Sequence, residues 1–203
     1  MDMVCTCFNS YAWLYNILAK IFLSPKKQYI EIQQSAQATK EHTVLDIGGG
    51  TGLVAQYFVS HVKTITIVDP AERMLKKVPK GIKVIQGTAQ QLPFPDNHFD
   101  IIYCCDAFHH FSNGYNNKDQ AIEQACHELV RVLTKKGKII ICEFHPQKRK
   151  AKIIIWLENS FFHWGSTFFT PEELMKRWTT KGMTCISHNL NDHMSYKAVI
   201  TFK

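Results

Sequence analysis

The sequence has no C-x-x-C pair, no internal repeat and no low-complexity stretch, so it shows no sign of a zinc-ligand ladder, a repeat array or a disordered linker. Cysteine occurs seven times, an odd number that cannot be paired completely in disulfides. Several of these cysteines fall inside apolar runs, where a free thiol acts as a small hydrophobic side chain. We therefore expect a reducing, cytoplasmic location.

Long hydrophobic runs are also missing. The best candidate lies within residues 1–27, where Asn16 and Lys20 interrupt it, and it is too short to span a bilayer. The same region lacks the basic start and the small-residue cleavage site of a secretion signal. No integral membrane segment is predicted, but the segment 153–169 is rich in aromatic residues and leaves peripheral membrane contact open. The alternative for that segment is a helix that packs on a sheet.

Acidic residues are fewer than basic ones, 17 against 24, which gives a formal net charge of +7. The basic residues are spread out except for QKRKAK at 147–152, which we interpret as a solvated surface turn. Because there is no long basic stripe and no signature of a base-modifying enzyme, nucleic acid is not an expected substrate.

Glycine is scarce, yet it is concentrated in one place. The chain has ten glycines, and four of them stand at positions 48, 49, 50 and 52 of the stretch VLDIGGGTG, residues 44–52. Glycine costs conformational entropy, so this loop must need a positive φ or a ligand lying against bare backbone.

The rest of the chain alternates apolar strands with amphipathic helices, which predicts a doubly wound parallel sheet in a single globular domain. Ligands of such sheets bind at the carboxyl ends of the strands, and the glycine loop leaves the first strand at that edge. The expected strands are 43–48, 64–69, 82–88, 99–105, 138–144, 184–190 and 196–202. The expected helices are 10–23, 27–37, 53–61, 71–78, 118–134 (with Gly137 just past its end) and 170–182 (with Thr170 as N-cap and Gly182 as stop).

Two cofactor classes use a glycine loop of this kind. A dinucleotide fingerprint, G-x-G-x-x-G, needs its third glycine where Leu53 stands, which argues against a nicotinamide oxidoreductase. The pattern that fits is D-x-G-x-G-x-G, which begins at Asp46. Asp69, at the end of the second strand, can bind both hydroxyls of a ribose in either class, and it can also cap the helix that follows.

Five segments resemble the class I S-adenosylmethionine-dependent methyltransferases, in particular the type 11 methyltransferase domain and the ubiquinone- and menaquinone-biosynthesis C-methyltransferases. They are FNSYAWLYN (8–16), VLDIGGGTG (44–52), VDPAERML (68–75), IQGTAQQLPFPDNHFDIIY (85–103) and ELVRVLTKKGKIII (128–141). The stretch CCDAFHHF (104–111) departs from the quinone-modifying members, which puts a quinone substrate in doubt. The resemblance implies a Rossmann-like, seven-stranded sheet with an antiparallel last strand and helices on both faces. It also implies an N-terminal helical segment, residues 1–40, folded over the cofactor site of a methyltransferase domain at 41–203.

The resemblance further implies S-adenosylmethionine as cofactor and S-adenosylhomocysteine as product. Asp46 would hold the ammonium end, Asp69 the ribose, and Pro70 and Ala89 would flank the adenine. Thr88 stands where the family usually has an aspartate, so its hydrogen bond to the adenine would be weaker. The expected cofactor-binding residues are Tyr15, Asp46, Gly48, Gly49, Gly50, Asp69, Pro70, Thr88, Ala89 and Cys104.

Methyl transfer from a sulfonium is an in-line displacement, in which the enzyme mainly aligns the nucleophile with the methyl group. A base is needed only if the nucleophile carries a proton. The candidates follow strands four and five and are Asp106, His109, His110, Glu143 and His145. The three histidines suit the task because histidine titrates near neutrality. We expect an enzyme that methylates a small molecule, with an apolar or aromatic acceptor left open, and no bound metal. The alternatives are a thiol or metalloid methyltransferase that uses Cys104 and Cys105, and a non-catalytic cofactor-binding module that regulates a partner.

Overall fold

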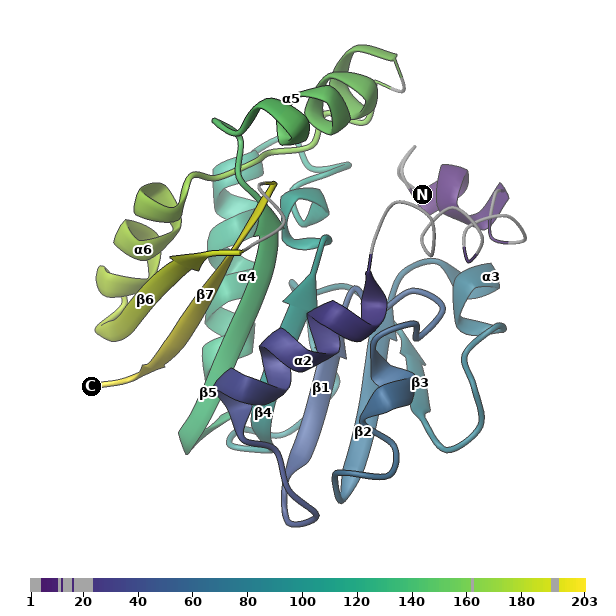
Figure 1. The fold of residues 1–203 in the computed structure, drawn as a ribbon, viewed down its shortest axis with the longest axis vertical. Coiled ribbons are helices and arrows are strands. Elements are labelled where there is room, and N and C mark those ends of the chain that lie inside the picture. Colours follow the sequence, from purple (N-terminus) through teal and green to yellow (C-terminus); the bar gives the residue numbers. More distant parts are fainter. Residues whose placement is uncertain (1–4, 11, 13–15, 17–23, 162, 191–193) are drawn as a thin grey trace.

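The computed structural model describes residues 5–10, 12, 16, 24–161, 163–190 and 194–203, and its centre is a seven-stranded sheet (Figure 1). The strands lie in the order β3-β2-β1-β4-β5-β7-β6. Their bounds are β1 Thr43–Ile47, β2 Thr64–Asp69, β3 Lys83–Gln86, β4 Phe99–Cys105, β5 Leu133–Phe144, β6 Met183–Asn189 and β7 Ser195–Phe202.

Strands β1 to β5 run parallel, and β7 is antiparallel to both of its neighbours, β5 and β6. The predicted doubly wound sheet with an antiparallel last strand is therefore confirmed. Because parallel strands end at the same edge, the loops after β1, β2 and β4 meet at the upper edge of the sheet in Figure 1. The glycine loop lies at this edge.

Helices cover both faces of the sheet. Helix α2 (Pro25–Ala36) and the short 3₁₀ helix η1 (Ala55–Tyr57) cover one face, and α4 (Lys118–Val132) and α6 (Pro171–Thr179) cover the other (Figure 1). Each layer closes its own apolar core against the strands. The remaining short helices are α3 (Glu72–Leu75), η2 (Phe108–His110), α5 (Arg149–Trp156) and the π-helix η3 (Leu157–Phe161).

The helix predicted over 118–134 is confirmed as α4. Its apolar residues recur at helical spacing, and Ile122, Ala125 and Leu129 are fully buried against the sheet. Asn117 starts the helix because its side-chain oxygen accepts a hydrogen bond from the N–H of Gln120.

Helix α6 also follows its sequence signals. Thr170 forms a capping box with Glu173, Pro171 occupies the first turn, and Gly182 adopts a positive φ of 76° where the chain turns away. The fully buried Trp178 anchors this helix to the sheet.

Arg131, in the last turn of α4, fastens the loop between β3 and β4 to that helix. Its guanidinium donates to the carbonyl oxygens of Leu92 and Phe94 at 3.0 and 2.8 Å. It also forms ion pairs with Asp96 and Glu128 at 2.8 and 2.7 Å. Glu128 adds a second contact, because its carboxylate accepts a hydrogen bond from the Leu92 N–H at 2.7 Å. The loop that carries Thr88 and Ala89 is thus held to α4 at its far end.

Two predicted helices are much shorter than expected. Residues 53–61 contain only η1, because Phe58 is fully buried with its ring stacked 5.3 Å from that of Tyr103, and this packing overrides local helix propensity. Residues 71–78 contain only the single turn of α3, and Pro79 disfavours helical backbone at the residue before it.

Gly137 does not end α4, contrary to the prediction, but lies inside β5, which starts directly after the helix. A Cβ at this position would lie 2.6 Å from the Leu133 side chain and 2.9 Å from the carbonyl oxygen of Asp100. Glycine is therefore required here by the close approach of two backbones.

Helix α2 confirms the prediction over 27–37, whereas the helix predicted over 10–23 falls largely outside the described residues. The turn predicted for the basic cluster 147–152 is confirmed only for Gln147 and Lys148, because the rest of the cluster forms the start of α5 beyond the carboxyl end of β5 (Figure 1). Within the ranges that the structure describes, no helix is long and apolar enough to cross a membrane.

Candidate active site

A cavity opens at the carboxyl edge of the sheet, beside the ends of β1, β2 and β4. The predicted site residues on its walls are Gly48, Gly50, Asp69, Pro70, Thr88, Ala89 and His110. A smaller pocket adjoins it and contains two more of them, Asp46 and Gly49. Cys105 and Asp106, at the end of β4, line both spaces, so one continuous site runs along the strand ends.

The glycine loop has the positive φ angles that its sequence predicted. Gly48 and Gly50 adopt φ angles of 74° and 54°, which other residues rarely tolerate. A Cβ on Gly48 would lie 2.6 Å from that of Ala107, and a Cβ on Gly49 would lie 2.6 Å from the Asp46 carboxyl group. Bare backbone therefore fits closely between the first and fourth strands.

Asp69 fixes this loop from the end of β2. Its carboxylate accepts hydrogen bonds from the N–H groups of Gly50 at 2.9 Å and Ala71 at 2.8 Å. Burial raises the pKa of Asp69 to about 6, although both hydrogen bonds favour the ionised form. The carboxylate keeps free lone pairs beside the cavity, where a hydroxyl group can donate.

Asp46 is the second buried carboxyl group of the site. Its Oδ2 accepts a hydrogen bond from the Tyr103 hydroxyl at 2.8 Å. Burial raises the pKa of Asp46 to about 8, the Tyr103 hydroxyl opposes this rise, and the charge of Asp69 adds to it. A cation bound beside Asp46 would favour the ionised carboxylate.

The wall between β2 and the loop after β3 is mostly apolar. Pro70, Ala71 and Met74 line it on one side, and Ala89 lines it on the other, with Thr88 beside them. Such a slot suits a flat ring, and the threonine offers a single neutral hydroxyl at its edge.

Cys104 does not line the site, in contrast to the prediction. Its side chain is fully buried among the residues that pack against α4, whereas Cys105 reaches the cavity from the opposite face of β4. Successive side chains of a strand point to opposite faces, so the two thiols cannot act together in one site. Burial also holds the pKa of the Cys104 thiol well above its usual range, which does not favour the thiol-dependent alternative.

His109 is fully buried and is absent from the cavity wall. Its Nδ1 lies 2.8 Å from Oε2 of Glu143, its Nε2 lies 3.5 Å from Oε2 of Glu158, and its ring stacks on that of Phe168 at 4.4 Å. Burial alone would lower its pKa, but the charge of Glu143, its hydrogen bond and Glu158 together raise the pKa to about 10. Such a group is a poor proton acceptor at neutral pH.

His110 and His145 have different surroundings. His110 lies on the cavity wall, with its Nδ1 3.1 Å from both the Asn113 amide nitrogen and the Ser166 hydroxyl. Burial, followed by the charge of His109, lowers its pKa well below the usual value, so the ring is neutral. His145 does not line the cavity, and its Nδ1 accepts from the Gln147 N–H at 3.3 Å. Of the three candidate histidines, only His110 faces the site.

Three further residues of the site were not among the expected cofactor-binding residues, although Asp106 was a candidate base and Phe8 begins one of the family-like segments. Asp106 has a positive φ of 49° at the end of β4 and accepts a hydrogen bond from Gln28 of α2. Phe8 and Tyr115 add aromatic side chains to the cavity wall. Tyr15, which the sequence also predicted for the site, lies outside the described residues.

A seven-stranded sheet of this order, with a glycine loop held between two buried acids at its carboxyl edge, defines a class I methyltransferase fold. The chain matches the family model described as "Methyltransferase domain" over residues 45–141. It belongs to the family of S-adenosylmethionine-dependent methyltransferases, as the sequence resemblance predicted.

Individual proteins of known sequence or structure are similar over most of this chain. The ubiquinone/menaquinone biosynthesis C-methyltransferase UbiE of Shewanella pealeana is 34% identical over 177 residues, which cover 79% of this chain and 66% of that protein. The crystal structure of YcgJ from Bacillus subtilis matches with a TM-score of 0.70 at 20% identity, over 88% of this chain and 99% of the other. The DhpI–SAH complex matches with a TM-score of 0.73 at 14% identity, over 97% and 93%.

The curated relatives extend beyond the matched region. The chain spans 66% of that UbiE protein and 44% of the curated YcgJ sequence.

Proposed function

We propose that this protein transfers the methyl group of S-adenosylmethionine, by in-line displacement, to a small-molecule acceptor. The observation that carries the proposal is the pair of buried carboxyl groups, Asp46 and Asp69, on either side of a glycine loop with positive φ. When bound, S-adenosylmethionine supplies an electrophilic methyl group on a cationic sulfur.

The residues present fit this cofactor. Gly48 leaves room that a Cβ would fill, Asp46 can pair with an ammonium group, and Asp69 can accept from ribose hydroxyls. Pro70 and Ala89 provide apolar contacts for an adenine ring, and the Thr88 hydroxyl can accept from its amino group. The sequence prediction of these roles stays a prediction until binding is measured.

The acceptor side of the cavity is formed by aromatic residues and one histidine. Phe8, Phe111 and Tyr115 line it together with His110, which favours a small apolar or aromatic acceptor. His110 is neutral and is placed to orient the acceptor or to take its proton.

The chain before α2, together with the first turn of α2, is proposed to cover this site, whereas the rest of α2 packs on a face of the sheet. Three contacts of the described part of this segment support that role. The Cys5 thiol donates to the carbonyl oxygen of Pro70 at 3.4 Å, Asn9 Oδ1 accepts from the N–H of Arg73 at 2.8 Å, and the Phe8 ring lies 5.7 Å from that of His110.

The test of the proposal is the pH dependence of S-adenosylhomocysteine binding. An ammonium group pairs only with ionised Asp46, whose raised pKa of about 8 means that protons compete below that pH. Affinity should therefore rise from pH 6 to pH 8, by up to about tenfold per unit, because one proton is displaced. Isothermal titration calorimetry at three pH values measures this slope.

The variant Asp46→Asn should bind more weakly and lose the slope. If the wild-type protein does not bind S-adenosylhomocysteine, or binds it with the same affinity at every pH, Asp46 is not the partner of the ammonium group. Tight binding without turnover of a broad acceptor panel that includes quinones, phenols and thiols would instead favour the non-catalytic module.

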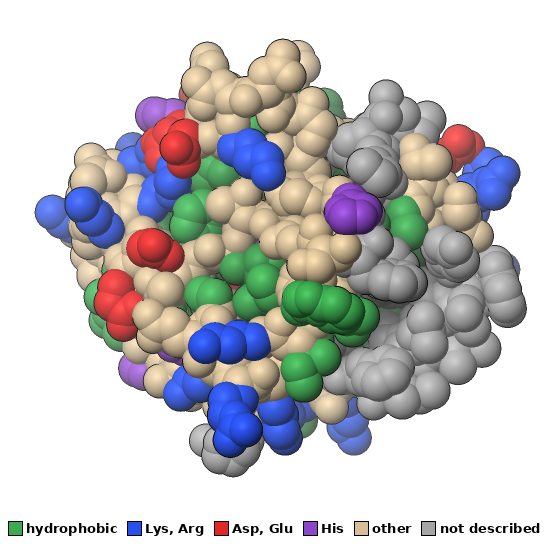
Figure 2. Space-filling view, turned by 90° about the horizontal axis from the view of Figure 1, so that it is seen from above, with side chains coloured by type: hydrophobic (Ala, Val, Ile, Leu, Met, Phe, Trp, Pro, Cys, Tyr) green, Lys and Arg blue, Asp and Glu red, His purple; other side chains and the backbone are tan. Residues whose placement is uncertain are grey.

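We also propose that the protein contacts a membrane surface through α5. Three apolar side chains of α5 and the start of η3 are exposed: Ile153, Trp156 and Leu157 have 63, 58 and 37% of their surface accessible to solvent. The exposed Arg149 and Lys152 lie next to them on the same helical face. Figure 2 looks down on this end of the molecule and shows exposed apolar side chains close to several basic ones. An apolar stripe with basic neighbours suits an anionic lipid surface. We propose a cytoplasmic location as well, because free cysteines are typical of a reducing compartment.

Co-sedimentation with vesicles tests this contact. We expect binding to vesicles that contain phosphatidylserine and none to pure phosphatidylcholine, with a several-fold loss in Lys152→Glu because each basic residue contributes about 1 kcal/mol. Lys76→Glu, at an exposed position of the chain after α3, is the matched control and should bind as the wild type does. Equal losses in both variants would argue against a specific role of α5.

A further inference from the structure

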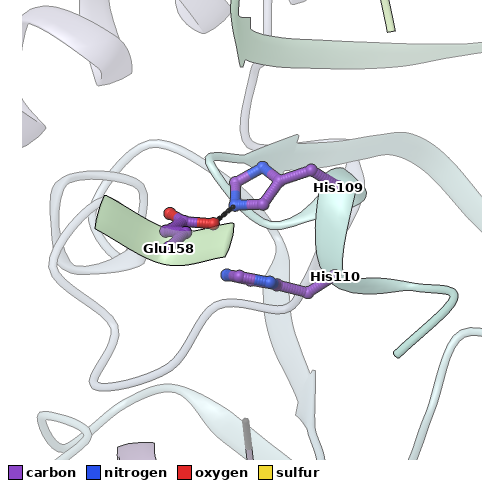
Figure 3. Close-up of side chains that lie close together, drawn as sticks. All are labelled: His109, His110 and Glu158. Carbon is purple, nitrogen blue, oxygen red and sulfur yellow. Dashed lines mark ion pairs between the residues drawn. The ribbon is translucent and has the colours of Figure 1, made fainter. Parts of the chain in front are cut away.

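Three side chains of the types that ligate metals converge next to the acceptor end of the cavity. His109 and His110 come from η2 and Glu158 comes from η3, and Figure 3 shows both rings directed toward the carboxyl group. One possible ligand atom from each residue lies within 4.8 Å of the others. The segments that carry these residues are far apart in the sequence, so the fold alone brings them together.

His109 is oriented by a second carboxylate on its other ring nitrogen. Its Nδ1 lies 2.8 Å from Oε2 of Glu143, which is itself held by the N–H groups of Phe108 at 2.8 Å and of Phe144 at 3.1 Å. A carboxylate in this position fixes the ring and directs Nε2 away from it, an arrangement common among metal-ligating histidines.

The atoms that remain have no hydrogen-bond partner. Nε2 of His109 and Oε2 of Glu158 are both buried without a hydrogen bond, and they form a long ion pair with each other at 3.5 Å. This separation is long for a hydrogen bond. It is close to the roughly 3.4 Å that two bonds of about 2.1 Å to a tetrahedral ion would impose.

We propose that His109, His110 and Glu158 bind a divalent first-row transition-metal ion such as Zn²⁺. Two histidines and one carboxylate are a ligand set typical of such ions, and a divalent ion would replace the proton through which His109 now pairs with Glu158. Closing the site around one ion requires the ligand atoms, which lie within 4.8 Å of one another, to approach to about 3.4 Å. The sequence predicts no metal here, since Glu158 stands in no motif.

Three protein ligands leave a coordination position open, and His110 lies on the cavity wall, so that position faces the acceptor. An acceptor oxygen bound there would lose its proton more readily. This last step rests on the proposed methyltransferase function, whereas the ion-binding site itself does not.

Cobalt(II) titration followed by absorption spectroscopy tests the site in the full chain. Cobalt distinguishes nitrogen and oxygen ligands from thiolates, which matters because the protein has seven free cysteines. We expect one ion per chain, visible ligand-field bands, no sulfur charge-transfer band, and displacement of the cobalt by Zn²⁺. Glu158→Gln and His110→Gln should each weaken binding by at least about tenfold.

The exposed His188 on β6 gives the matched control, because His188→Gln should leave cobalt binding unchanged. Melting temperatures without metal check that each variant is folded, and the two ligand variants test the site independently. Absence of stoichiometric binding, a thiolate spectrum, or binding unaffected by both ligand variants would overturn the proposal. Cobalt binding without S-adenosylhomocysteine binding would refute the methyltransferase function and leave the metal site standing.

Discussion

Replacing Asp69 with asparagine is expected to reduce S-adenosylhomocysteine affinity by about a hundredfold or more. The carboxylate is placed to accept from two ribose hydroxyls, and a hydrogen bond to a charged group contributes about 1.5–3 kcal/mol. An amide keeps the size of the side chain but offers only one oxygen to the N–H groups of Gly50 and Ala71. One backbone donor would then lose its partner, and the glycine loop would lose part of its support.

Calorimetric titration with S-adenosylhomocysteine measures this effect, and thermal unfolding without ligand separates it from a loss of folding. The melting temperature should change little, because two effects oppose each other. Burial raises the pKa of Asp69 to about 6, so the neutral amide removes the cost of a buried charge at pH 7, while the loss of one backbone hydrogen bond destabilises the loop. Asp119→Asn is the control, since that side chain is 88% exposed on α4. Unchanged affinity in Asp69→Asn would remove Asp69 from the cofactor site.

The second large effect is expected for Gly48→Ala. Its φ of 74° costs a non-glycine residue about 1–2 kcal/mol, and the added methyl group would lie 2.6 Å from the Cβ of Ala107. Overpacking of this kind costs about 1–3 kcal/mol more. The loop must shift to relieve the contact, and any shift disturbs the wall that the cofactor would touch.

Gly182→Ala separates the two causes. Gly182 has nearly the same φ, 76°, but nothing lies within 4 Å of its would-be Cβ, so this variant reports backbone strain alone. Urea unfolding should show a larger loss in the free energy of unfolding for Gly48→Ala than for Gly182→Ala. S-adenosylhomocysteine binding should be lost only in Gly48→Ala. Equal stability and equal binding in the two variants would show that the close contact at Gly48 has no consequence.

The sequence predicts best those features that are repeated along the chain or concentrated in a short motif. All seven strands were predicted, because apolar runs bounded by turn residues leave few alternatives. Asp46, Gly48 and Asp69 were also predicted together, since their chemistry depends on spacing within a strand–loop–helix unit that the fold preserves.

Features that depend on long-range packing were not predictable. A strand buried on both faces has no alternation of polar and apolar residues, so the sequence could not tell whether Cys104 or Cys105 faces the cavity. The short η1 depends on the burial of Phe58 beneath Tyr103 of another strand. Glu158 meets His109 only because η3 returns across the strand ends, and no local pattern predicts that path.

The contacts of Arg131 should restrict how the sequence can change in evolution. Its guanidinium joins the segment that contains Leu92 and Asp96 to the helix that contains Glu128, so two stretches separated in the sequence form one inherited unit. A lysine in its place would keep the charge but not the planar set of donors that reaches both carboxylates and both carbonyl groups. Lineages that lose this arginine should therefore also be free to change Asp96 and Glu128, and the loop beside Thr88 and Ala89 would diverge with them.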